Sequence, residues 1–80
     1  MPDMDTVRIA ARDAVRDMIG AALPDDESLI CSGRIDSLSI LNLISRIETR
    51  LGIRLKTGGL QPDDFDTIDL IAETVLRAKA

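Results

Sequence analysis

Ser37 is the residue of this sequence best placed to take part in chemistry, and it lies in the segment Gly33–Leu38. Asp36 directly before it is a typical helix N-cap, because a short carboxylate accepts hydrogen bonds from the first amides of a helix. With Asp36 as the cap, Ser37 takes the first helical position and its hydroxyl points outward beside the positive end of the helix dipole. A helix N-terminus attracts anions, so a phosphate ester on Ser37 is favoured there. Leu38 follows too close to the helix end to be fully buried, and we expect it to contact the enzyme that handles Ser37.

An Asp-Ser pair at a helix start is also common capping chemistry, and by itself it indicates only a cap. The letters Asp-Ser-Leu occur as well in serine hydrolases, but those enzymes need a histidine to activate the serine. This chain has no histidine and a single cysteine. We therefore expect no catalytic residue in the chain and no metal site of the ordinary zinc-ligand type.

The composition of the 80 residues argues against several classes of function. A net charge of −4 does not suit a nucleic-acid module, which needs Lys and Arg to neutralise phosphates, and Phe65 is the one aromatic residue. No apolar run is long enough to cross a bilayer, so no membrane insertion is expected. The single cysteine cannot form an internal disulfide, and Met1–Asp5 is acidic where a signal peptide would be basic. We expect a cytoplasmic monomer with one domain over residues 1–80.

The spacing of apolar residues predicts an all-α fold, a small four-helix bundle of three longer helices and one short helix. The first helix is expected to begin at a cap on Asp3 or Asp5 and to end at Gly20. The second is expected to run from Asp36 to Gly52. Its apolar stripe is predicted to consist of Leu38, Leu41, Ile44, Ile47 and Leu51, widened by Ile40 and Leu43.

A short helical turn is predicted over residues 62–65, where a proline and two acids suit a helix start. The last helix is predicted to begin after a cap at Asp66 or Thr67.

A long loop separates the first two helices. Because long connections are uncommon unless their own side chains hold them, we expect apolar residues to fix the loop to the core. The candidates are Leu23, Leu29, Ile30 and Ile35. Cys31 is expected to be a small buried residue, and Val75 of the last helix is expected to be buried as well.

Four segments follow one another along nearly the whole chain: Gly33–Leu38, Leu41–Glu48, Leu51–Ile53 and Phe65–Ile68. In this order they resemble the acyl and peptidyl carrier protein family. The resemblance implies that a phosphopantetheinyl transferase converts Ser37 to a 4′-phosphopantetheine ester, with Asp36 helping the magnesium of the transferase to engage. It also implies that the thiol of this arm receives acyl or aminoacyl groups from a loading ligase. The arm would then present these thioesters to a downstream synthase or transferase.

The predicted second helix departs from the pattern of bacterial fatty-acid carriers, in which this helix is strongly acidic. It bears Arg46 and Arg50 against Glu48 alone, and such a basic face would repel the basic patches of fatty-acid synthases. We therefore expect a freestanding carrier of a specialised pathway, with polyketide, peptide and aminoacyl or D-alanyl cargo left open. The expected partner contacts are Leu38, Ile40, Arg46 and Arg50. A small helical protein-protein interaction module without a prosthetic group is the alternative, because helical bundles host many functions.

Overall fold

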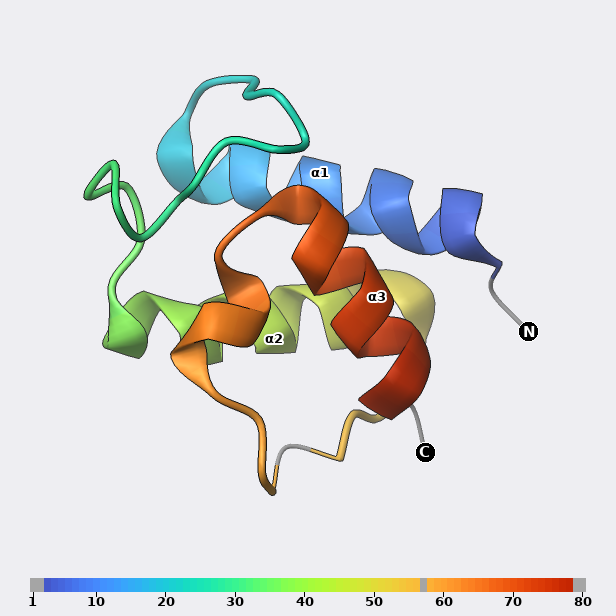
Figure 1. The fold of residues 1–80 in the computed structure, drawn as a ribbon. Helices are drawn as coiled ribbons and strands as arrows, with labels where there is room; N and C mark the ends of the chain where they lie inside the picture. The colour runs from blue at the N-terminus through green and yellow to red at the C-terminus, as the bar shows by residue number, and fades with distance from the viewer. Residues whose placement is uncertain (1–2, 57, 79–80) are drawn as a thin grey trace.

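The computed structural model describes residues 3–56 and 58–78, which form three α-helices and one short 3-10 helix (Figure 1). These elements are α1 (Met4–Ile19), α2 (Ser37–Leu51), η1 (Pro62–Phe65) and α3 (Ile68–Ala78). α1 packs against both α2 and α3, and η1 packs against α2 and α3. The predicted all-α class is confirmed for the described residues, and the fourth helical element is a single 3-10 turn rather than an α-helix.

Local hydrogen bonds set the ends of α1 and α2 where the sequence predicts them. The carboxylate of Asp3 accepts a hydrogen bond of 2.8 Å from the Thr6 amide, so Asp3 and not Asp5 is the cap of α1. Gly20 ends α1 with a φ of 83°, and Gly52 ends α2 with a φ of 66°. Both glycines adopt the left-handed conformation that strains other residues, which explains why each helix stops there.

The core is one cluster of buried side chains to which all three α-helices contribute. Ile47 of α2 and Val75 of α3 are fully buried at 0% exposure, as predicted. α1 contributes the small buried residues Ala11 and Ala14, which leave room for the larger side chains of the other helices. No helix within the described ranges is long and apolar enough to cross a membrane.

The buried face of α2 differs from the apolar stripe that the sequence predicts to face the core. Leu38 and Leu41 are exposed, while the buried residues of α2 are Ile40, Leu43, Ile44 and Ile47. The predicted stripe advanced in three-residue steps, and each such step falls short of the 3.6 residues of a helical turn. The stripe therefore rotates away from the core toward the N-terminus of α2, where Ile40 and not Leu41 faces inward.

The long connection between α1 and α2 is fixed to the core by its apolar residues, as predicted. Leu29 and Ile35 are buried, and Leu23 and Ile30 pack against the core in partly buried positions. The Leu29 amide also donates a 2.6 Å hydrogen bond to the carbonyl of Asp66. These contacts hold the two ends of the segment that leads into Ser37.

Asp66 is hydrogen-bonded to the long connection and does not cap the N-terminus of α3. Its carboxylate accepts hydrogen bonds from the Ser28 hydroxyl at 2.6 Å and from the Ile30 amide at 3.1 Å. The hydroxyl of Thr67 accepts from the Leu70 amide at 3.0 Å, so Thr67 caps the first turn of α3.

The expectation that Cys31 is buried is wrong, because its side chain is exposed. Consecutive turns run from Leu29 to Gly33, and the Leu29 side chain fills the inward position of this segment. The Cys31 amide donates to the Ser28 hydroxyl at 3.1 Å, which holds the residue on the outer side of the turn. Residues in consecutive tight turns follow neither the helical nor the extended spacing of buried side chains. The burial of Leu29 therefore does not imply that Cys31 is buried.

Candidate functional site

Ser37 is the first residue of α2, and it is exposed. Asp36 has extended backbone angles (φ −111°, ψ 179°), and its carboxylate accepts a hydrogen bond of 2.8 Å from the Ser39 amide. This is the N-cap geometry predicted from the Asp-Ser-Leu letters. The cap fixes the direction of the first turn, and the hydroxyl of Ser37 lies at the positive end of a 15-residue helix.

The charge of Asp36 follows from the same hydrogen bond. Donation from the Ser39 backbone amide lowers the pKa of the Asp36 carboxyl below its ordinary value. Asp36 is therefore ionised at neutral pH and places a carboxylate directly beside Ser37. The chain contains no histidine, so none of its own imidazoles is available to accept the Ser37 proton.

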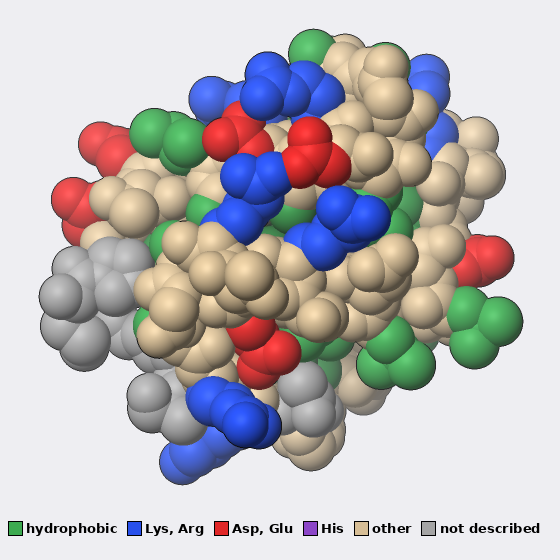
Figure 2. Space-filling view, turned by 180° about the vertical axis from the view of Figure 1, so that it is seen from behind, with side chains coloured by type: hydrophobic (Ala, Val, Ile, Leu, Met, Phe, Trp, Pro, Cys, Tyr) green, Lys and Arg blue, Asp and Glu red, His purple; other side chains and the backbone are tan. Residues whose placement is uncertain are grey.

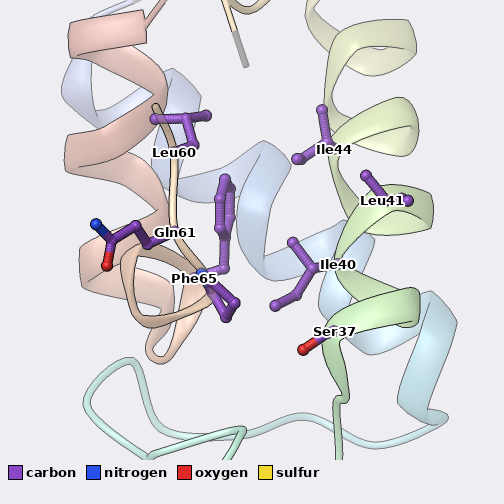
Figure 3. A pocket seen from close by; sticks show the side chains of 8 residues that line it. Ser37, Ile40, Leu41, Ile44, Leu60, Gln61 and Phe65 are labelled. Carbon is purple, nitrogen blue, oxygen red and sulfur yellow. The ribbon is translucent and has the colours of Figure 1, made fainter. Parts of the chain in front are cut away.

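A pocket of about 240 Å³ opens beside Ser37, between α2 and the segment that enters η1 (Figure 3). Its lining residues are Ser37, Ile40, Leu41, Ile44, Leu60, Gln61, Pro62 and Phe65. In Figure 3 the Ser37 hydroxyl lies at one end of the pocket and the Phe65 ring stands opposite Ile40. The walls are mainly apolar side chains, so the space next to the serine suits an apolar group better than a charged one.

The predicted contact residues do not all lie on one surface. Leu38 is 80% exposed, which confirms that it is not wholly buried. Ile40 is only 6% exposed, and it lines the pocket instead of the outer surface. Leu41 is 66% exposed and lies close to Ser37. The sequence pattern had predicted Leu41 in the core stripe. The four-residue spacing of Ile40 and Ile44 is the signal that could have identified the true core face.

The two predicted arginines have different surroundings. The Arg50 guanidinium binds the carboxylate of Asp17 on α1, in an ion pair that joins the two helices. Arg46 is exposed and borders a shallow hollow together with Ser45, Thr49 and Arg50. Figure 2 shows one face of the molecule, where basic and acidic side chains lie side by side near the middle.

Four lining residues were not predicted to border the site: Leu60, Gln61, Pro62 and Phe65. They follow Ser37 by more than twenty residues, and only the packing of η1 against α2 brings them close to it. No local sequence signal links them to the serine.

The structure thus defines a small all-α protein with an exposed serine at the start of its second helix. Within residues 3–56 and 58–78, no group of three or more His, Cys, Asp or Glu side chains is arranged to hold a metal ion. Comparisons with protein-family models, with curated proteins and with solved structures found no match to this chain.

Proposed function

We propose that the chain is a carrier protein whose Ser37 holds a 4′-phosphopantetheine arm. The observation that carries this proposal is the exposed position of Ser37, directly after its capping Asp36 and at the end of a connection fixed to the core. A carrier needs one accessible attachment atom on a small stable body, and it needs no catalytic group of its own. The resemblance of the segments around Ser37 to acyl and peptidyl carrier proteins supports the same reading.

The surroundings of Ser37 suit a phosphodiester. The first amides of α2 and its dipole favour negative charge at this end of the helix. In the modification, the Ser37 oxygen would form a bond to the phosphorus of coenzyme A that bears the pantetheine. The phosphoanhydride bond to adenosine 3′,5′-bisphosphate would break, and the transferase would accept the serine proton. Asp36 would lie beside the transferase's magnesium, as the resemblance implies.

The proposed cargo is an acyl or aminoacyl group, held as a thioester on the arm. A ligase would load it, and a downstream synthase or transferase would receive it. Arg46 and Arg50 stand against the single acid Glu48 in α2, so we assign the carrier to a specialised pathway and not to bulk fatty-acid synthesis. Within this proposal, α1, α2, η1 and α3 correspond to the four helices of a carrier bundle, and the protein acts as a cytoplasmic monomer.

The test is the intact mass of the protein after incubation with coenzyme A and a broad-specificity phosphopantetheinyl transferase. We expect the wild-type chain to gain the mass of one phosphopantetheine group and the Ser37→Ala variant to gain none. Ser45→Ala is the matched control, because Ser45 is another exposed serine of α2, and this variant is expected to be modified fully.

The alternative is a helical interaction module without a prosthetic group, and the exposed Leu38 and Leu41 favour a protein-binding role. Such a module would gain no mass under conditions in which a known carrier is modified completely. A gain that persists in Ser37→Ala would contradict the assignment of the attachment atom.

A further inference from the structure

The part of the long connection that leads into α2 is bound to one distant residue, Asp66. The Asp66 carbonyl accepts a 2.6 Å hydrogen bond from the Leu29 amide. Its Oδ1 atom accepts from the Ser28 hydroxyl at 2.6 Å and from the Ile30 amide at 3.1 Å. Three consecutive residues of the connection are therefore bound to a single residue just before α3, and a charged acceptor makes two of these bonds stronger than neutral ones.

The same contacts extend from Asp66 toward Ser37 through Leu29. The Leu29 carbonyl accepts hydrogen bonds from the Arg34 amide at 3.0 Å and from the Ile35 amide at 3.2 Å. Leu29 and Ile35 are also buried, at 0% and 3% exposure. Ile35 lies two positions before Ser37. Residues 28–35, the turn segment, are thus closed on themselves at Leu29, and the position of this segment determines where Ser37 lies.

Other polar contacts near the turn segment do not fix its position. Among residues 3–56 and 58–78, every polar contact to the turn segment from outside the long connection goes to Asp66. The ion pair of Arg34 with Glu27 lies within the connection, and surface pairs of this kind contribute little. Asp25 is bound to Arg12 of α1, but it precedes the turn segment. Asp66 is therefore the polar tie between this segment and the rest of the molecule.

We propose that Asp66 is a positioning residue for the modification of Ser37. It holds the turn segment in the arrangement from which a phosphopantetheinyl transferase engages the serine, and it acts through Ser28, Leu29 and Ile30. The inference rests on the proposed function of Ser37. When the competent arrangement is only a fraction of the population, the apparent affinity falls by that fraction. Loss of the Asp66 carboxylate should therefore raise the KM for the chain and leave kcat unchanged, because the bound chain reacts from the same arrangement.

The first experiment measures the initial rate of mass gain against the concentration of the full chain, at saturating coenzyme A. Asp66→Ala is expected to raise the KM about fivefold, with kcat within about twofold of the wild-type value. Asp66→Asn is the conservative variant, because both side-chain bonds go to Oδ1 and an amide oxygen can accept them there. Its KM is expected to return to within about twofold of the wild type.

The matched control is Thr67→Ala, at the next position in the chain. It removes the bond that the Thr67 hydroxyl accepts from the Leu70 amide at 3.0 Å, so it weakens the fold without touching the turn segment. Its KM is expected to stay within about twofold of the wild type, and all variants are assayed well below their melting temperatures. An equal rise of KM in Asp66→Ala and Thr67→Ala would overturn the proposal. A fall in kcat at unchanged KM, or a failure of Asp66→Asn to restore the KM, would overturn it as well.

The second experiment does not depend on the modification of Ser37. NMR relaxation and relaxation dispersion of the labelled chain report motion of the Arg34 and Ile35 amides on fast and slow timescales. We expect these amides to gain motion in Asp66→Ala and to stay as rigid as in the wild type in Asp66→Asn and Thr67→Ala. Unchanged motion in Asp66→Ala would refute the positioning role. No mass gain by the wild-type chain would instead refute the proposed function, so the two failures are distinguishable.

Discussion

The carboxylate of Asp66, just before α3, accepts a 2.6 Å hydrogen bond from the hydroxyl of Ser28 in the long connection. The two residues are 38 positions apart, so this bond closes a large loop of the chain that includes α2. The same carboxylate accepts from the Ile30 amide at 3.1 Å. Asp66, although distant in the sequence, therefore fixes the segment that leads to Ser37.

Replacement of Asp66 by alanine is expected to lower the free energy of unfolding by about 2 kcal/mol. The reason is that the substitution leaves two part-buried donors, the Ser28 hydroxyl and the Ile30 amide, without their acceptor. Urea denaturation measures the change. Asp63→Ala is the control, because Asp63 is exposed and its loss should change stability by less than about 0.5 kcal/mol. Equal midpoints for the two variants would show that the Asp66 bonds add nothing to stability.

Two substitutions of Asp36 distinguish its role as a helix cap from the role of its negative charge. Asp36→Ala removes the acceptor of the Ser39 amide and should lower the melting temperature, whereas Asp36→Asn keeps a capping oxygen and should melt close to the wild type. If the proposed modification needs the carboxylate, Asp36→Asn gains the arm more slowly although it is folded. Melting curves and the time course of mass gain supply the two measurements. A fast gain in Asp36→Asn would limit Asp36 to capping.

The stability of the fold is expected to fall with acid, in part through Asp25. Arg12 donates to this carboxylate at 2.8 and 3.1 Å, and these bonds hold the pKa of Asp25 below its ordinary value of 3.8. The unfolded chain then binds the Asp25 proton at a higher pH than the folded chain does. The stabilisation is complete above the ordinary pKa and is lost as the pH falls below it.

Urea midpoints measured between neutral pH and acid check this prediction. Asp25→Asn should be less stable at neutral pH and should lose less stability on acidification than the wild type does. An identical pH profile for the two proteins would mean that the Arg12 contact does not favour the ionised carboxyl.

Ile47→Ala is expected to destabilise the protein by about 2–5 kcal/mol, since the side chain is fully buried in the core cluster. Leu41→Ala removes a similar side chain from the exposed face of the same helix. It should cost less than about 0.5 kcal/mol. A similar loss of stability in both variants, measured by urea denaturation, would be inconsistent with the rotated core face of α2.

Much of the local structure was predictable because it depends on neighbours a few residues apart. Asp36 caps α2 through the amide of Ser39, three positions later, and Gly52 ends the helix by its own conformational freedom. The exposed position of Ser37 follows directly from that cap. The choice between Asp66 and Thr67 at α3 could not be made in this way, because a contact with a distant part of the chain engages Asp66.

The sequence by itself determined the helical segments, the two ends of α2, the burial of Ile47 and Val75, and the serine at the start of α2. Short-range hydrogen bonds and apolar periodicity set these features. The spacing of Ile40 and Ile44 also indicates the inward face of α2, although the predicted stripe placed Leu41 in the core. Tertiary structure alone paired Arg50 with Asp17 and brought η1 beside Ser37 to form the pocket. These features require residues far apart in the chain to meet, and only the packing of whole helices brings such residues together.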